Sequence, residues 1–166
     1  QIWLIYEKDN EWHTESVGTI GDPAKIPLPV DISITADDQH LWVNTWNDGM
    51  TRVFDISNPH NAKEVYTHKI GDQVNMLSQS WDGKRVYFTS SLLANWDKPD
   101  ETGGEGKEGI PQFFKAFHWD GNSLSHQFTI DFGAEKLGMP HQMRFGAYSL
   151  YAKTPENSKN LAELSQ

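Results

Sequence analysis

The sequence predicts an all-β chain made of about three blades of antiparallel strands. The first observation is a repeat, in which residues 31–57 and 76–97 align at an offset of 45 positions with Asp37 over Asp82. The second is that each copy places a tight turn between two short apolar strands, and Asp-Gly between alternating strands is a strong hairpin signal. A repeat of about 40–50 residues built only from strands is typical of a β-propeller.

A hairpin pattern that occurs three times, at residues 2–21, 52–71 and 113–133, extends this prediction. Each copy is an apolar strand, a turn rich in Asp, Asn, Pro and Gly, and a second strand that ends in Gly. We interpret each copy as the outer hairpin of a blade. Strands after the first hairpin are expected near residues 32–36, 40–46, 51–56, 64–70, 75–80, 85–91, 112–118 and 125–131, with helix only in short turns or after Lys153.

The predicted order is an outer hairpin, one blade, a second blade with an insertion, and the start of another blade. The insertion, residues 98–109, is rich in glycine and charge and is expected to be an exposed loop. The propeller portion is expected over residues 1–151 and a polar tail over residues 152–166. An ordinary β-sandwich with coincidental spacing is the alternative.

The predicted ring is incomplete. A propeller needs roughly four to eight blades to close, whereas about three are predicted, and Gln1 falls in the middle of a blade. An open arc exposes strand edges and an apolar face, which favours aggregation. We therefore expect a missing N-terminal part or another chain to complete the ring, an oligomeric assembly, and an insoluble or self-associating polypeptide when these 166 residues stand alone.

Composition excludes several classes of function. The chain has 23 acidic and 14 basic residues and a net charge of −9, which disfavours non-specific binding to nucleic acid. It has no run of 18 apolar residues, so no membrane span is expected. It has no cysteine, so these residues supply no disulfide, thiolate ligand or cysteine nucleophile. Phosphate-loop, nucleophile-elbow and metalloprotease motifs are also missing.

Two motifs carry a resemblance to a known family. They are SWDGKRVYFTSSLLANWDK at residues 80–98 and the D-F-G…H…R run from Asp131 to Arg144. With the segment 31–57, they resemble the C-terminal part of the selenium-binding protein/methanethiol oxidase family, over about residues 27–146. After Arg144 the sequence departs from the Gly-Gly-Asp that is frequent in the family, so the closure of the ring is expected to differ there.

The resemblance implies a β-propeller and, for bacterial members, a copper-dependent oxidase that converts methanethiol, oxygen and water to formaldehyde, hydrogen sulfide and hydrogen peroxide. The implied partners are the remainder of the propeller and a small thiol substrate. The periplasm is the expected location, with the cytoplasm as the alternative. A non-catalytic propeller that binds selenium or a protein is the alternative function, because a fold does not fix a function. A bound copper would distinguish the two.

His141 is the single candidate metal ligand. It follows Gly138 and Pro140 at the predicted start of a strand, and neutral imidazole is a good ligand for copper. A surface or turn histidine is the alternative, and the resemblance favours the ligand. Because one histidine cannot hold copper alone, the other ligands are expected from missing sequence.

The neighbours of His141 remain open to two readings. Met139 and Met143 are interpreted as core filling rather than as soft copper ligands. Arg144 either pairs with a carboxylate that orients His141 or forms a structural salt bridge. The segments 46–49 and 96–98 are interpreted as tryptophan wedges between blades with aspartate turn caps. The remaining histidines show no paired spacing and are assigned no metal: His13, His40, His60, His68, His118 and His126.

Overall fold

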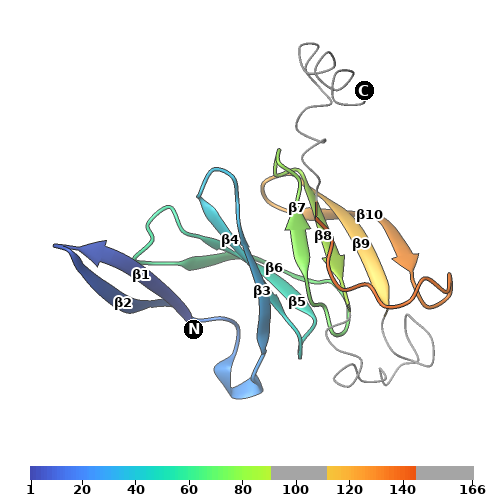
Figure 1. The fold of residues 1–166 in the computed structure, drawn as a ribbon, viewed down its shortest axis with the longest axis horizontal. Coiled ribbons are helices and arrows are strands. Elements are labelled where there is room, and N and C mark those ends of the chain that lie inside the picture. The colour runs from blue at the N-terminus through green and yellow to red at the C-terminus, as the bar shows by residue number, and fades with distance from the viewer. Residues whose placement is uncertain (91–111, 145–166) are drawn as a thin grey trace, which may run out of the picture.

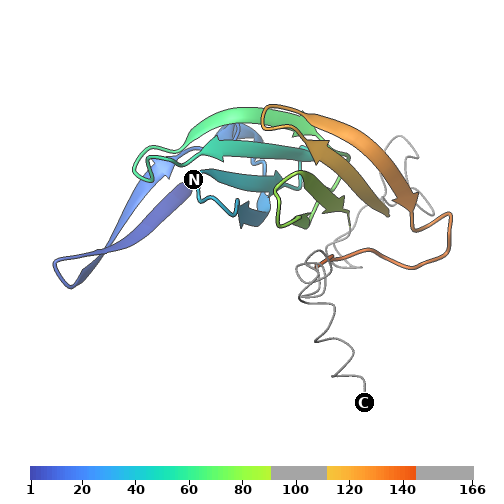
Figure 2. The same ribbon diagram turned by 90° about the horizontal axis from the view of Figure 1, so that it is seen from above.

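The structure is a computed structural model that describes residues 1–90 and 112–144. These residues form three antiparallel sheets that follow one another along an arc (Figures 1 and 2). The first sheet is a hairpin of β1 (Ile2–Lys8) and β2 (Glu11–Gly18). The second is a meander of β3 (Pro29–Ile34), β4 (His40–Thr45), β5 (Met50–Asp55) and β6 (Lys63–Lys69). The third is a meander of β7 (Leu77–Gln79), β8 (Arg85–Thr89), β9 (Phe113–Trp119) and β10 (Leu124–Asp131).

The strand pairing confirms the repeat. Ser33 pairs with Trp42 between β3 and β4, and Ser78 pairs with Tyr87, each 45 positions later, between β7 and β8. The three hairpins predicted from the sequence are β1–β2, β5–β6 and β9–β10. Two of them form the outer halves of four-stranded sheets. Consecutive four-stranded antiparallel sheets of this kind are the blades of a β-propeller.

The two inner turns have the same hydrogen bonds. Thr35 Oγ1 donates to Asp37 Oδ1 at 2.6 Å, and Ser80 Oγ donates to Asp82 Oδ1 at 2.5 Å. In each turn the aspartate also accepts a backbone N–H two residues later, at 3.1 Å. These bonds favour the ionised carboxylate, so the hydroxyl first and the backbone N–H second lower the pKa of both Asp37 and Asp82. The repeated turn is therefore stabilised when its aspartate is charged.

We expect this pair of turns to contribute to acid sensitivity. Because the folded-state pKa of each aspartate lies below the usual value of 3.8, the unfolded chain binds more protons and stability falls as the pH falls through this range. The double variant Asp37→Asn, Asp82→Asn keeps an acceptor in each turn but cannot titrate. Its free energy of unfolding should depend less on pH below about pH 4 than that of the wild type. Urea titrations of the complete propeller at a series of pH values test this, and an unchanged pH dependence would contradict it.

The core lies between the sheets, because the side chains of β4 alternate between two covered faces. Trp42 points toward the third sheet, whereas Leu41 and Val43 point toward the β1–β2 hairpin. The larger cluster lies between the second and third sheets and contains Trp42, Val53, Ile70, Val74, Leu77, Val86, Phe88, Phe113, Phe117 and Leu124. The smaller one contains Ile20, Leu41, Val43, Phe54 and Ala62. A sheet whose central strands are covered on both faces, as β4 and β5 are, belongs to a stack of blades and not to a two-layer sandwich.

Each strand range predicted from the sequence contains a strand. Two strands differ clearly from their predicted ranges: β3 spans Pro29–Ile34 where residues 32–36 are predicted, and β7 is three residues long where residues 75–80 are predicted. The pairing becomes irregular before it: Asn75 N donates to Thr89 O at 2.8 Å, and Thr89 N donates to Met76 O at 3.0 Å. Helix within residues 1–90 and 112–144 is confined to one 3-10 turn, Pro23–Lys25, as expected. The insertion at 98–109, the segment 96–98 and the tail at 152–166 lie outside the described residues.

Candidate functional site

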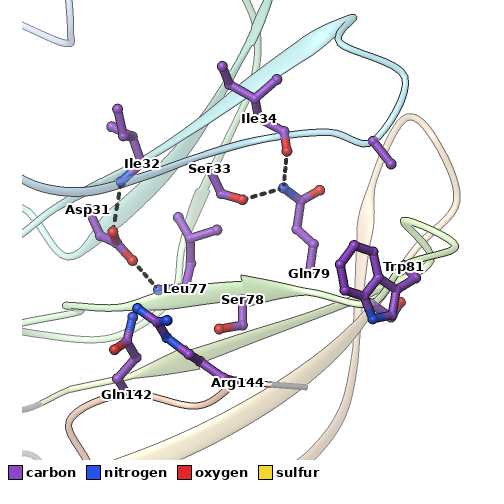
Figure 3. Close-up of a pocket in the computed structure, with 12 residues that line it drawn as sticks. Asp31, Ile32, Ser33, Ile34, Leu77, Ser78, Gln79, Trp81, Gln142 and Arg144 are labelled. Carbon is purple, nitrogen blue, oxygen red and sulfur yellow. Dashed lines mark hydrogen bonds between the residues drawn. The ribbon is translucent and has the colours of Figure 1, made fainter. Parts of the chain in front are cut away.

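The inner strands β3 and β7 meet where the second and third sheets approach each other (Figure 1). Asp31 joins them, because one of its carboxylate oxygens accepts a hydrogen bond from Leu77 N at 2.7 Å and the other accepts one from Ile32 N at 3.0 Å. Further along, Gln79 Nε2 donates to Ser33 Oγ at 2.8 Å. Side-chain hydrogen bonds therefore connect the two blades at their inner edges (Figure 3).

Asp31 is half-buried, and its surroundings shift the pKa of its carboxyl in opposite directions. Burial raises the pKa of its carboxyl, and this effect exceeds the lowering by the N–H groups of Leu77 and Ile32 and by the nearby His141. The carboxyl therefore retains its proton to a higher pH than a solvated aspartate does. The influence of His141 also shows that its imidazole lies within electrostatic reach of Asp31.

We expect Asp31→Ala to lower the free energy of unfolding by about 1–3 kcal/mol, because the buried N–H of Leu77 would lose its acceptor. Asp31→Asn keeps an amide oxygen that can accept this bond, so its loss should be smaller. Urea unfolding of the complete propeller, followed by tryptophan fluorescence, measures both variants. Equal losses for alanine and asparagine would show that the bond from Leu77 is not what Asp31 contributes.

A groove of about 510 Å³ opens beside this contact, between β3, β7 and residues 142–144. Its polar lining consists of Asp31, Ser33, Ser78, Gln79, Ser80, Gln142 and Arg144. Its apolar lining includes Ile32 and Ile34, which are 62% and 54% exposed. The side chains of Gln142 and Arg144 point toward the Asp31–Leu77 contact (Figure 3). The groove can take a small, partly apolar molecule, and the guanidinium of Arg144 favours an anionic one.

His141 lies in the segment that runs beside the third sheet. Its carbonyl accepts a hydrogen bond from Thr89 Oγ1 at 2.6 Å, and the carbonyl of Met143 accepts one from Ser78 Oγ. His141 is exposed, whereas Pro140 before it is buried. The segment therefore follows the third sheet as the start of another blade would, and the exposed imidazole of His141 is accessible to further polypeptide or to a metal.

The described residues could supply only part of a copper site. His141 supplies one imidazole, and Asp31 is a carboxylate within its electrostatic reach. Residues 1–90 and 112–144 hold no group of three His, Cys, Asp or Glu side chains that could bind a metal ion. A copper centre would therefore need further ligands from elsewhere, and the role of His141 as a ligand stays a prediction.

The neighbours of His141 differ from the sequence-based interpretation. Met139 is 38% exposed, Met143 is half-buried, and neither belongs to the two core clusters, so core filling is not what the described part of the chain shows. Arg144 forms no ion pair with the carboxylates of residues 1–90 and 112–144. The carboxylate that His141 affects is Asp31, whose pKa it lowers.

In the segment 46–49 Asp48 caps the turn, as predicted, whereas Trp46 belongs to neither of the two core clusters between the sheets. Trp46 is buried, and Asp48 accepts hydrogen bonds from Met50 N at 3.2 Å and from Arg52 Nη2 at 2.5 Å. Burial alone would raise the pKa of Asp48, but the bonds from Arg52 and Thr45 leave it below its usual range. His60 pairs with Glu15 at 2.8 Å, and burial lowers the pKa of His68.

The sequence profile of the 56 kDa selenium binding protein family matches residues 1–149. The chain belongs to this family. It is 57% identical over 153 residues to a methanethiol oxidase from Ruegeria pomeroyi, and 54% identical over 158 residues to one from Hyphomicrobium. These alignments cover 92% and 95% of this chain but only 34% and 35% of the two relatives. The chain thus spans about a third of the length of these methanethiol oxidases.

A solved structure supports the same family. The crystal structure of a hypothetical selenium-binding protein from Sulfolobus tokodaii superposes with a TM-score of 0.62 and 27% sequence identity. The superposition covers 79% of this chain and 35% of that one. Among the described residues of this family member, no helix is long and apolar enough to cross a membrane.

Asp31 was not identified as a site residue from the sequence. The feature that could have indicated it is a difference between the two copies of the repeat. At the offset of 45 positions, Ser33 lies over Ser78 and Asp37 over Asp82, whereas Asp31 lies over Met76. A polar residue that occurs in both copies has a role within each blade, as Asp37 and Asp82 do in their turns. A carboxylate present in only one copy is a candidate for a role specific to that blade.

Proposed function

We propose that this chain forms the C-terminal portion of a copper-dependent methanethiol oxidase. The proposed reaction converts methanethiol, O2 and water to formaldehyde, hydrogen sulfide and hydrogen peroxide. The observation that carries the proposal is the 57% identity, over 92% of this chain, to a protein named methanethiol oxidase. Because the chain spans about a third of that relative, the active enzyme would need the remainder of the propeller.

An uncovered apolar face supports this need. Trp3, Ile5 and Trp12 are 61%, 65% and 73% exposed on one face of the β1–β2 hairpin. Ile2 and Val17 of the opposite face pack against the second sheet. In the second sheet the central strands β4 and β5 are covered on both faces. A further blade packed on the hairpin would bury this surface, and each Å² of apolar surface removed from water contributes about 25 cal/mol.

The residues of this chain would have separate tasks in the reaction. His141 would be one ligand of copper, which supplies electron transfer between the thiol and O2 when bound. Ile32 and Ile34 would form the apolar wall for the methyl group of methanethiol. Arg144, on the same groove, would favour the thiolate over the neutral thiol, because a nearby positive charge stabilises the charged form.

The complete protein tests the proposal through its metal content and its products. One copper per propeller, with formaldehyde, hydrogen sulfide and hydrogen peroxide formed from methanethiol, would support it. A copper-loaded complete protein that leaves methanethiol unchanged would contradict it. We place the enzyme in the periplasm, with the cytoplasm as the alternative, and cell fractionation distinguishes the two.

A non-catalytic propeller that binds selenium or a protein partner is the second candidate. It is favoured by the family description and by the Sulfolobus tokodaii relative, which is described as a hypothetical selenium-binding protein. A complete protein without copper that retains selenium after incubation with selenite would favour this candidate over the oxidase.

A further inference from the structure

One hydrogen bond recurs between consecutive blades. Asn44 on β4 donates from Nδ2 to Asn75 O at 2.8 Å. Thr89 on β8, which lies 45 positions after Asn44, donates from Oγ1 to His141 O at 2.6 Å. In both cases a polar side chain near the end of a blade's second strand reaches the main chain that follows the blade. His141 therefore has the place relative to the third sheet that Asn75 has relative to the second.

Both donor side chains are buried, so each depends on its carbonyl acceptor. Asn44 is fully buried and Thr89 is 3% exposed. A buried donor that loses its acceptor is costly, because water cannot replace the bond. The main chain of Thr89 is held independently, since Thr89 O accepts a bond from Asn75 N and Thr89 N donates to Met76 O. Hydrogen bonds thus connect Asn44, Asn75, Thr89 and His141 in one chain.

A second donor holds the same segment two residues later. Ser78 Oγ donates to the carbonyl of Met143. Between these two attachments lies Gln142, whose side chain lines the groove beside Asp31. Two fixed carbonyls on alternate residues define the direction of the main chain, and this direction sets where the side chains of the segment stand.

We infer that Thr89 is a positioning residue that docks the main chain of His141 and thereby sets the place of its imidazole, next to Gln142 in the groove wall. Only the use of His141 as a copper ligand rests on the proposed function. The docking itself needs no metal. A hydroxyl is required because it is the donor to the carbonyl, and valine has the same shape as threonine without this donor.

The test compares Thr89→Val with Thr89→Ser in the complete propeller, by hydrogen–deuterium exchange of the amides in residues 139–144. Loss of one hydrogen bond should speed the exchange of this segment roughly 3- to 10-fold in the valine variant. The serine variant keeps the hydroxyl and should restore exchange close to the wild-type rate. Thr67→Val, which removes a hydroxyl on β6 that donates to Thr51 O at 3.4 Å, is the matched control and should leave residues 139–144 unaffected.

Unchanged exchange of residues 139–144 in Thr89→Val would overturn the inference, and so would equal acceleration in the serine variant. If the valine variant does not fold, Ser78→Ala supplies the second measurement, because it removes the other donor to the segment and should speed its exchange as well; unchanged exchange there would overturn the inference. In the copper-loaded protein, the electron paramagnetic resonance spectrum should change in Thr89→Val and not in Thr67→Val. A complete protein without copper would contradict the proposed function, while the exchange rates would still decide the docking.

Discussion

Replacing His141 by alanine in the complete propeller is expected to remove bound copper and methanethiol oxidation together. The physical reason is the direct loss of one imidazole from the proposed metal site. Loss of an outer partner of a ligating histidine already lowers metal affinity or activity about 10–100-fold, so loss of the ligand itself should cost at least as much. The β-sheet circular dichroism should be retained, because His141 is exposed and its contact with the third sheet is through its carbonyl.

His118→Ala is the matched control for this experiment. His118 is also an exposed histidine of the third sheet, on β9, and it is not among the residues that line the groove beside Asp31. Its alanine variant should keep both copper and activity. A His141→Ala protein that still binds copper would exclude His141 as a ligand and would strengthen the non-catalytic alternative.

The blades were predictable because their signals are local in the chain. Each aspartate turn lies within a few residues of the strands that it joins, and the unbroken apolar run of β4, residues 41–43, marks a strand that is buried on both faces. The 45-residue offset then repeats these signals, and Ser33–Trp42 and Ser78–Tyr87 confirm the register. The short β7 was not predictable, because its irregular start depends on pairing of residues 75 and 76 with Thr89.

The site was predictable only in part, because its contacts join residues far apart in the sequence. Asp31 and Leu77 are separated by 46 positions, and Thr89 and His141 by 52. Spacing within one motif cannot show such pairs. His141 could be singled out from its surrounding motif, but the carboxylate near it could not. Arg144 drew attention as a neighbour in sequence, whereas Asp31 is the group whose pKa His141 affects.

Phe88→Ala is expected to give a large loss of stability, about 3–5 kcal/mol. Phe88 is fully buried on β8, and its ring lies 5.6 Å from that of Phe117 and 6.5 Å from that of Trp42. Trp42 belongs to the second sheet, so the alanine variant leaves a cavity between two blades as well as removing apolar contacts. Since whole domains are stable by about 5–15 kcal/mol, this change should markedly lower the urea midpoint of the complete propeller.

Phe128→Ala is the control that distinguishes loss of a contact between blades from loss of any aromatic side chain. Phe128 lies on β10 and is 46% exposed, with its ring 6.0 Å from that of Phe114. Its removal leaves no closed cavity, so its alanine variant should lose about 1 kcal/mol or less. If both variants lose the same stability, the contact between Phe88 and Trp42 is not what holds the two blades together. A large loss for Phe88 alone would show that adjacent blades stabilise each other through this cluster, as a ring of stacked blades requires.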